Sequence, residues 1–329
     1  MKTIRIGMIG ANPRALWYAA LFDDVDPERF AALVPAHYHH LTYYDREELW
    51  LNRARGFHLA RVYDPDFAAA EQLAAAFRHP VRPCRTLDEV SDDVDLVFIA
   101  NESGDGSDHR GLSSPGLMKS VPTFVDRPLA RTVKDARAMV RLAKKHGAPL
   151  LSCSHLRMLP HAEWFKARYR EFHRVERGTV QGHGPNPAHI ADGIELSLFL
   201  FGDPFGGRVD CVQSTGDWPL QILWTRYATA EQRHVLAGLI LSNAPATPRQ
   251  PFFAKAVSLG KPLMTDDLDA FVQPEGGLGV LNTLHEMVAS GRPPLSVATM
   301  IEHVAVAEAG RLAHERGEAV MVRDVRGRG

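Results

Sequence analysis

The stretch Ile4-Arg5-Ile6-Gly7-Met8-Ile9-Gly10-Ala11-Asn12-Pro13-Arg14-Ala15 joins an apolar strand pattern to the start of a helix pattern. In the dinucleotide fingerprint the first glycine allows a tight turn, the second lets the backbone approach a pyrophosphate, and the third permits close helix-strand packing. Gly10, Asn12 and Ala15 occupy these places. Asparagine tolerates a left-handed backbone but adds a side chain near the phosphates. The stretch predicts a nucleotide-binding strand, turn and helix.

The first half of the chain alternates short apolar runs with longer helical patterns, which is typical of βαβ units on a parallel sheet. The predicted strands are residues 4–9, 58–63, 96–100, 123–125 and 149–152. The predicted helices are residues 13–22, 67–77 and 133–146. We therefore expect an α/β fold with a Rossmann-like domain over residues 1–152.

From about residue 173 the apolar pattern changes to longer, more alternating segments, which indicate an open, largely antiparallel sheet. Its predicted strands are residues 173–184, 208–215, 220–227, 234–242 and 252–258. The predicted helices are residues 188–201, 279–289 and 297–316, followed by a short strand at 320–322. These elements predict a C-terminal α+β domain over residues 153–329, which would bind the substrate and form the oligomer.

Residues 24–55 form an insertion between the first helix and the second strand, because such connections usually span two to six residues. The insertion contains His37, His39 and His40, which raise the question of a metal site. No cysteine or acidic partner stands at ligand spacing, so we predict a packed surface segment or a subunit contact and no metal.

The composition is that of an ordinary globular protein long enough for two domains, with 329 residues, 45% of them hydrophobic and 23% charged. Because the 38 basic and 39 acidic residues are interspersed, nothing indicates nucleic acid as a partner. No apolar run approaches the ~20 residues of a membrane span. Cys84, Cys153 and Cys211 are far apart and odd in number, which favours a reducing compartment. We expect a cytoplasmic protein.

Several stretches resemble the Gfo/Idh/MocA oxidoreductases. Val125-Asp126-Arg127-Pro128-Leu129-Ala130 resembles their acidic-Lys-Pro signature, whose Lys-Pro bond is often cis, with Arg127 in place of the lysine. Residues 95–101 and His109 resemble the family's fourth-strand segment and the histidine that follows it. Residues 152–157 resemble the segment that leads into the second domain, and residues 304–322 resemble the last helix and strand. The resemblance covers nearly the whole chain and implies a homo-oligomer formed through the C-terminal sheet.

The resemblance also implies a nicotinamide cofactor. Asp64 stands at the end of the second predicted strand, where an acid accepts hydrogen bonds from the adenosine ribose hydroxyls. No arginine follows it directly to bind a 2'-phosphate, so NAD is predicted rather than NADP. The candidate cofactor-binding residues are Gly10, Asn12, Pro13, Arg14, Asp64, Asn101, His109 and Asp126.

In the family a Gly-Ile-His type motif supplies a catalytic histidine, and alignment on Gly202-Asp203-Pro204 places Asp192 at that position. A carboxylate can accept a hydroxyl proton when its surroundings tune it. His189 lies three residues earlier, on the same face of a helix, and could pair with Asp192. The guanidinium of Arg127 stays charged at neutral pH, so it could hold a substrate carboxylate or orient Asp192. The candidate catalytic residues are Asp192, His189 and Arg127.

His155, Arg157 and His183, together with Arg127, are candidate substrate-binding residues. A metal held by His183, His189 and Asp192 is not predicted, because the i, i+3 spacing is common. These assignments predict an oxidoreductase that transfers a hydride between nicotinamide and a sugar, polyol or related hydroxylated small molecule. Two alternatives stay open: an NAD-assisted lyase or hydrolase of the same fold, and a non-catalytic binding or regulatory protein in which Asp192 and Arg127 form a structural salt bridge.

Overall fold

The computed structural model describes residues 3–33, 54–100, 104–168, 175, 177–183, 187–202, 208–215, 220–228, 234–242, 252–258, 261–264, 268 and 273–327. The chain divides into two compact units. Unit 1 comprises Met1–Ala130, Ala136–Cys153 and Gly277–Val297, and unit 2 comprises Arg131–Asp135, Ser154–Gly276 and Ala298–Gly329. His37, His39 and His40 lie outside the described residues.

Unit 1 contains a six-stranded parallel sheet in the order β3-β2-β1-β4-β5-β6. The strands are β1 (Ile4–Ile9), β2 (Phe57–Tyr63), β3 (Arg82–Cys84), β4 (Leu96–Ile99), β5 (Thr123–Asp126) and β6 (Leu150–Cys153). This order confirms the Rossmann-like sheet. Every residue of β4, β5 and β6 is buried, as expected of strands covered on both faces.

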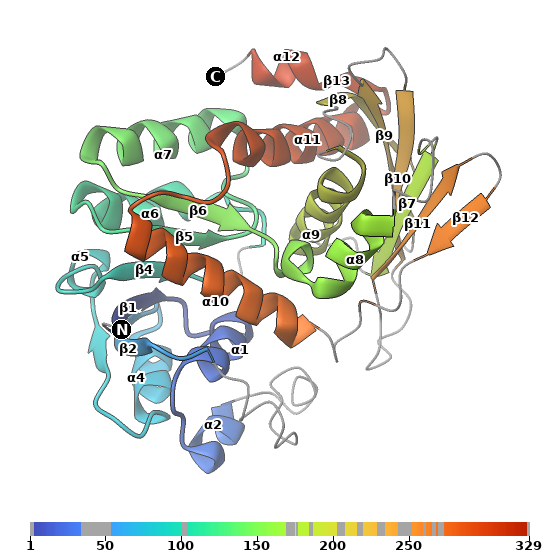
Figure 1. Cartoon of the computed structure of the whole chain (residues 1–329). Helices are drawn as coiled ribbons and strands as arrows, with labels where there is room; N and C mark the ends of the chain where they lie inside the picture. Colours follow the sequence, from blue (N-terminus) through green and yellow to red (C-terminus); the bar gives the residue numbers. More distant parts are fainter. Residues whose placement is uncertain are drawn as a thin grey trace. The chain divides into compact units, whose positions relative to one another are not determined.

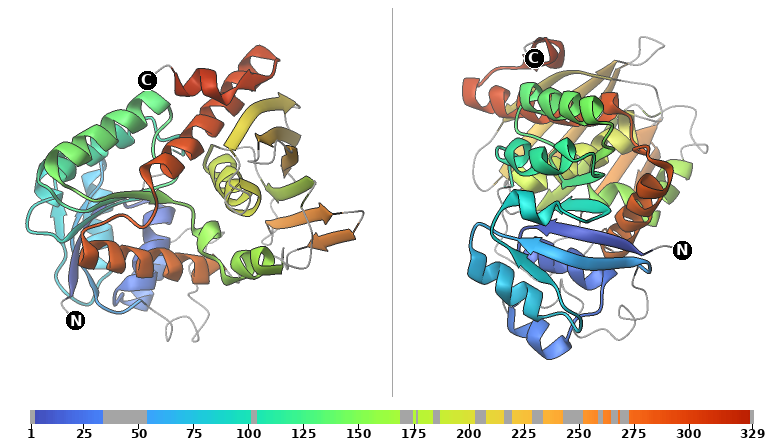
Figure 2. Two further views of the ribbon diagram at one scale, coloured as in Figure 1. Left: turned by 45° about the horizontal axis from the view of Figure 1, so that its top comes forward. Right: turned by 90° about the vertical axis from the view of Figure 1, so that its left-hand side faces the viewer.

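Helices cover both faces of this sheet (Figures 1 and 2). The helices of this unit are α1 (Pro13–Phe22), α2 (Pro27–Leu33), α4 (Phe67–Ala75), α5 (Leu87–Val90), α6 (His109–Met118) and most of α7 (Val133–His146) and α10 (Gln273–Ser290). Tyr18 of α1 packs edge-on against Phe98 of β4, with ring centroids 4.8 Å apart. A Cβ at Gly116 of α6 would contact Val97, the residue before Phe98 in β4. Because successive strand residues point to opposite faces, α1 and α6 lie on opposite faces.

Unit 2 contains a seven-stranded sheet in the order β12-β11-β7-β10-β9-β8-β13 (Figure 1). Its strands are β7 (Arg177–His183), β8 (Arg208–Thr215), β9 (Leu220–Ala228), β10 (His234–Ser242), β11 (Phe253–Ser258), β12 (Lys261–Met264) and β13 (Val320–Met321). All neighbours pair antiparallel except β10 and β7, which are parallel. The predicted open, largely antiparallel sheet is confirmed.

The helices of unit 2 include α9, whose close packing on the sheet depends on two glycines. The helical segments are η2 (His155–Met158), α8 (Pro160–Ala167), α9 (Pro187–Ser197), a π-helical turn at Leu198–Gly202, α11 (Val297–Arg316, almost entirely in this unit) and α12 (Val322–Arg326). A Cβ at Gly193 of α9 would collide with Leu239 of β10, and one at Gly178 of β7 with the Phe201 ring. No helix within the described ranges has the length and apolar character needed to cross a membrane.

Several predicted boundaries differ from the structure, and two of these differences mark a local change of structure. The predicted helix at 188–201 is an α-helix only to Ser197 and continues as the π-helical turn. The predicted strand at 320–322 ends at Met321, because Val322 begins α12. The strands β3 and β12 were not predicted, since segments of three and four residues are too short to show alternation.

Candidate active site

The turn between β1 and α1 is built around Gly10. Its φ of +114° is a conformation that other residues rarely adopt, and a Cβ there would collide with the carbonyl oxygen of Ala100. Its N–H donates to the carbonyl of Tyr63, 2.8 Å away. The turn is therefore fixed where β1, β2 and β4 end, which is where open α/β sheets bind ligands.

The side chain of Asn12 caps α1. Its Oδ1 accepts hydrogen bonds from the N–H groups of Arg14 (2.9 Å) and Ala15 (3.1 Å), and its Nδ2 donates to the carbonyl of Ala100 (3.0 Å). The first helical residue, Pro13, has no N–H to offer. Two of the amides that could bind a pyrophosphate at this helix start are thus already occupied by the protein itself.

Asp64 directly follows β2 and faces the same turn. Its Oδ2 accepts the N–H of Ala11 at 2.8 Å, and its Oδ1 accepts the N–H of Asp66 at 2.9 Å. A carboxylate oxygen has two lone pairs, so these bonds orient the group and leave capacity for further donors. The position fits the predicted role as acceptor for ribose hydroxyls, which stays a prediction.

Asp126, at the end of β5, is the centre of a buried ionic cluster. Its Oδ2 accepts from Arg14 Nε (2.7 Å) and from Arg127 Nη1 (2.5 Å). Its Oδ1 accepts from Arg14 Nη2 (3.3 Å) and from the hydroxyl of Tyr18 (3.4 Å). The Arg127-Pro128 peptide bond is cis. Asp126 thereby joins the signature segment to the first turn of α1.

The ionic cluster around Asp126 shifts the pKa values of two of its members. Burial and the charge of Arg127 act to lower the pKa of Arg14, but Asp126 and Tyr18 oppose them and the pKa is raised. Burial, then Asp126, raise the pKa of Tyr18 well above its usual value, so Tyr18 stays a neutral donor.

His109 and Asn101, the other two predicted cofactor residues, have different outcomes. Asn101 lies outside the described residues. His109 begins α6, is 2% exposed, and places Nδ1 2.8 Å from the carbonyl oxygen of Pro128. Burial lowers the pKa of His109, so it is neutral at pH 7. It braces the loop after Arg127, and a direct cofactor contact remains a prediction.

In unit 2, Asp192 is buried in α9 and hydrogen-bonded to the segment that follows β6. The Ser154 hydroxyl donates to Asp192 Oδ1 at 2.5 Å and accepts the N–H of Leu156 at 3.1 Å. His155 Nδ1 lies 3.9 Å from the same carboxylate oxygen. Asp192 and His155 are only 2% and 3% exposed. Ser154 thus fixes the orientation of the carboxylate that we expect to handle a proton.

Glu195, one turn after Asp192, is a second buried carboxylate and was not among the predicted site residues. Its Oε2 accepts the N–H of Ser154 at 2.8 Å and lies 3.5 Å from His303 Nδ1. Burial, then the charge of Arg157, lowers the pKa of His303 to about 3, so this histidine is neutral at pH 7. The i, i+3 spacing of Asp192 and Glu195 could have indicated that both carboxylates lie on one face of a helix. No sequence pattern marked Ser154 or His303 as site residues.

The remaining predicted residues are placed less completely. His189 lies one turn before Asp192 in α9 and is half-buried, and its pairing with Asp192 stays a prediction. The Arg157 guanidinium lies over the Phe199 ring, 4.7 Å from its centroid. His183 is the last residue of β7, and its side chain is outside the described part.

We expect His303 to make the protein less stable in mild acid. Its pKa is about 3 in the fold and 6.5 ordinarily, so as the pH falls below 6.5 the unfolded chain takes up a proton that the folded chain refuses. Between pH 7 and pH 5 this lowers the free energy of unfolding by about 2 kcal/mol. Denaturant unfolding should show a smaller acid loss in His303→Asn, whereas His314→Asn, at an exposed histidine of α11, should behave like the parent. Equal losses in all three proteins would contradict the assignment.

Comparison with known proteins agrees with this geometry. Residues 36–154 match the profile of the Gfo/Idh/MocA family, an oxidoreductase family with an NAD-binding Rossmann fold. A comparison with curated proteins finds no match.

Three solved structures share the fold along nearly the whole chain. GenD2 from gentamicin A biosynthesis, solved in complex with NAD, is 15% identical, with a TM-score of 0.73 and coverage of 98% of this chain and 97% of that one. A putative myo-inositol dehydrogenase from Sinorhizobium meliloti is 16% identical (TM-score 0.70, coverage 97% and 100%). The scyllo-inositol dehydrogenase of Lactobacillus casei, solved with NAD(H) and scyllo-inositol, is 11% identical (TM-score 0.70, coverage 98% and 100%). At these identities the likeness establishes the fold alone. The chain thus matches the profile of the Gfo/Idh/MocA family over residues 36–154 and shares the fold of these three structures along nearly its whole length.

Proposed function

We propose that the chain is an NAD-dependent oxidoreductase acting on a sugar, polyol or related hydroxylated small molecule. The observation that carries the proposal is the turn at Gly10, with the Asp64 carboxylate bound to the turn's own backbone. A tight glycine turn, an acid after the second strand and a helix start are the parts that hold a dinucleotide in this fold. The proposal rests on these parts and on the family match.

The residues that would hold NAD belong to unit 1. Asp64 would accept from the ribose hydroxyls, and the absence of an arginine directly after it favours NAD over NADP. The backbone N–H of Asn12 and the guanidinium groups of Arg14 and Arg127 would meet the pyrophosphate. When bound, NAD supplies a hydride acceptor at C4 of its nicotinamide ring.

Asp192 is the residue that we propose takes the proton. When a secondary alcohol becomes a ketone, its carbon loses a hydride and its hydroxyl loses a proton, and a carboxylate within hydrogen-bond reach can accept that proton. The bond from Ser154 fixes the direction in which the carboxylate points. Arg127 cannot replace it, because a guanidinium stays protonated at neutral pH. We assign Arg127, His155, Arg157 and His183 to substrate binding and His189 to supporting Asp192.

The substrate class follows the solved relatives, two of which are inositol dehydrogenases by name. Such molecules present several hydroxyl groups, which suit a site that offers charged and imidazole side chains. We further propose a cytoplasmic homo-oligomer formed through the sheet of unit 2. Sedimentation equilibrium of the purified chain would test the oligomer.

A non-catalytic ligand-binding protein is the second candidate. Two observations favour it: Arg127, which stands where relatives carry lysine, is paired with Asp126, and the amides at the start of α1 are capped by Asn12. The NAD-assisted lyase or hydrolase would use the same cofactor site with a different net reaction.

An assay of NAD reduction separates these possibilities. The proposed enzyme should form NADH with at least one member of a panel of polyols, sugars and sugar acids. A chain that is inert across the panel, and that contains no NADH when purified, would count against redox catalysis.

We expect Asn12→Gly to bind NADH about tenfold more tightly than the parent. The change releases the amides of Arg14 and Ala15, and one hydrogen bond to a charged group contributes roughly 1.5–3 kcal/mol, where 1.4 kcal/mol is a factor of ten. The loss of the cap to glycine costs only a few tenths of a kcal/mol.

Isothermal titration calorimetry measures the change, with Asn12→Ser as the matched control. Serine also caps helices, so its affinity should stay near that of the parent. A glycine variant that binds NADH no better than the serine variant would show that the cap does not compete with the cofactor.

A further inference from the structure

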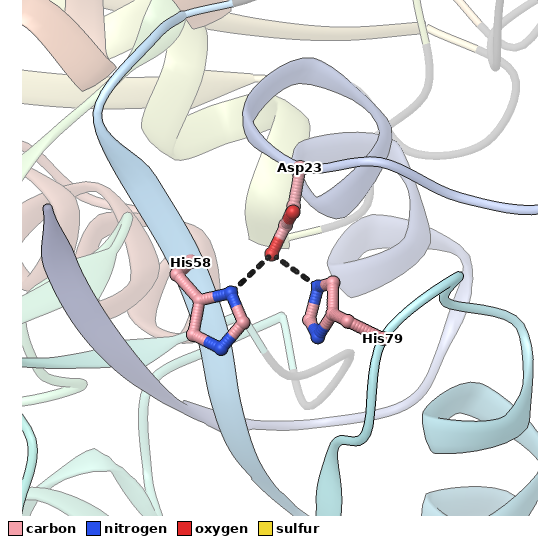
Figure 3. A group of neighbouring side chains, drawn as sticks. All are labelled: Asp23, His58 and His79. Carbon is pink, nitrogen blue, oxygen red and sulfur yellow. Dashed lines mark hydrogen bonds and ion pairs between the residues drawn. The ribbon is translucent and has the colours of Figure 1, made fainter.

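Three potential metal ligands converge in unit 1, away from the candidate active site. Asp23 Oδ2 lies 3.0 Å from His79 Nε2 and 3.8 Å from His58 Nδ1. Figure 3 shows the two imidazoles directed at the same carboxylate oxygen. The ring centroids are 4.1 Å apart with the planes inclined by 38°, and the three ligand atoms lie within 4.8 Å of one another.

The fold holds each of the three side chains in place. Asp23 ends α1, where its N–H donates to the carbonyl of Ala19, and its Oδ2 accepts the N–H of Leu59 at 2.5 Å. His58 is the second residue of β2, and His79 lies in the loop between α4 and β3. The cluster therefore lies at the amino-terminal edge of the sheet, whereas Gly10 and Asp64 lie at the carboxyl edge.

The separations suit a tetrahedral ion. At metal-ligand distances of about 2.0–2.1 Å, two tetrahedral ligands lie about 3.4 Å apart. The distances from Asp23 Oδ2 to the two imidazole nitrogens, 3.0 Å and 3.8 Å, lie on either side of that value. His79 Nδ1 lies 3.4 Å from the carbonyl of Pro80, the kind of partner that fixes a metal-binding imidazole. His79 Nε2 is within hydrogen-bond distance of Asp23 Oδ2, so a bound cation would replace the proton shared by these two atoms.

The exposure of the three side chains also suits a metal. The side chains of Asp23, His79 and His58 are 9%, 23% and 38% exposed. An ion can enter from solvent, and water can complete its coordination.

We propose that Asp23, His58 and His79 bind one divalent transition metal ion, with Zn²⁺ the best match to two imidazoles and a carboxylate. Bound there, the ion ties the end of α1 to the start of β2 and to the loop before β3. Its role is structural, because the cluster and the nucleotide turn lie at opposite edges of the sheet. The proposal is independent of the proposed redox function and of His37, His39 and His40.

The test uses the full chain, stripped with EDTA and then titrated with ZnCl₂ by calorimetry at pH 7.5. We expect one saturable site per chain and a rise in the unfolding temperature, as mass action requires of a ligand that binds the folded state. Cobalt chloride should give visible d–d absorption of a tetrahedral ion. Affinity should fall at pH 5, because protons compete for the imidazoles.

Single variants assign the ligands. Loss of an outer-shell partner alone weakens metal binding about 10–100-fold, so His58→Gln and His79→Gln should each weaken zinc binding at least tenfold. The exposed His314→Gln is the matched control and should bind like the parent. Circular dichroism of the metal-free variants verifies that they fold.

Two results would overturn the proposal. One is the absence of saturable binding of zinc and cobalt to the folded parent. The other is zinc binding that survives in folded His58→Gln and His79→Gln but disappears when His37, His39 and His40 are changed together to alanine.

Discussion

Replacing Asp192 by asparagine is expected to lower turnover by about 10²-fold or more while leaving the affinity for NADH unchanged. An amide cannot accept the hydroxyl proton, and positioned acid-base groups contribute roughly this much to rate. Asparagine has nearly the same shape as aspartate and can still accept the hydrogen bond from Ser154, so the fold should be kept. Steady-state kinetics and calorimetry on the same preparation measure both quantities.

The control for this change is Ser154→Ala, which removes the orienting hydrogen bond but keeps the carboxylate. It should cost less turnover than Asp192→Asn and should retain a pH-rate profile governed by Asp192. The double variant Arg127→Lys with Asp192→His restores the residues of the family motifs and tests the binding-protein alternative. Under that alternative the parent is inactive, and the double variant should gain dehydrogenase activity. An Asp192→Asn protein that turns over like the parent would exclude Asp192 as the base.

Replacing Asp126 by asparagine is expected to lower the free energy of unfolding by about 3–5 kcal/mol. The change removes the anion that Arg14 and Arg127 share, whose side chains are 17% and 9% exposed, and removing one partner of a largely buried ion pair costs about this amount. Asp126 is 3% exposed and accepts from both guanidiniums. Chemical denaturation monitored by circular dichroism measures the loss.

The exposed pair of Arg311 and Glu315, 2.6 Å apart on α11, provides the contrast. Glu315→Ala should cost only about 0.3–0.5 kcal/mol, the usual worth of an i, i+4 pair on a helix surface. If Asp126→Asn cost no more than Glu315→Ala, the Asp126 cluster would contribute little to stability.

The fold could be predicted from the sequence because its elements show their periodicity locally. Val133–His146 was predicted with the observed bounds, since its apolar and charged residues separate cleanly at helical spacing. The central strands were found as continuous apolar runs, which double-sided burial produces. The strand β3 (Arg82–Cys84) was not predicted, because only one of its three residues is fully buried.

The site was predictable only where a motif or the family pattern marked a residue. Asp192 was assigned by its place in the family motif, whereas its partner Ser154 lies 38 positions away. Tyr18 and Asp126 are 108 positions apart, and Asp23 and His79 are 56 apart. Such contacts arise from the tertiary fold, so no local spacing in the sequence indicates them.

The role of the Asn12 side chain also could not be predicted from the sequence. The sequence marked it as a departure from the glycine fingerprint, with a side chain near the phosphates. In the structure that side chain turns back to cap α1 and reaches Ala100. Whether a polar side chain serves a ligand or its own helix depends on its rotamer, which a sequence pattern does not specify.

The most direct test of the central claim is a calorimetric titration of the purified full chain with NADH and, separately, with NADPH. The account predicts saturable binding of NADH, with weaker binding of NADPH because Asp64 repels a 2'-phosphate. Absence of saturable binding of either nucleotide would contradict the cofactor site, and tighter binding of NADPH would contradict the role given to Asp64.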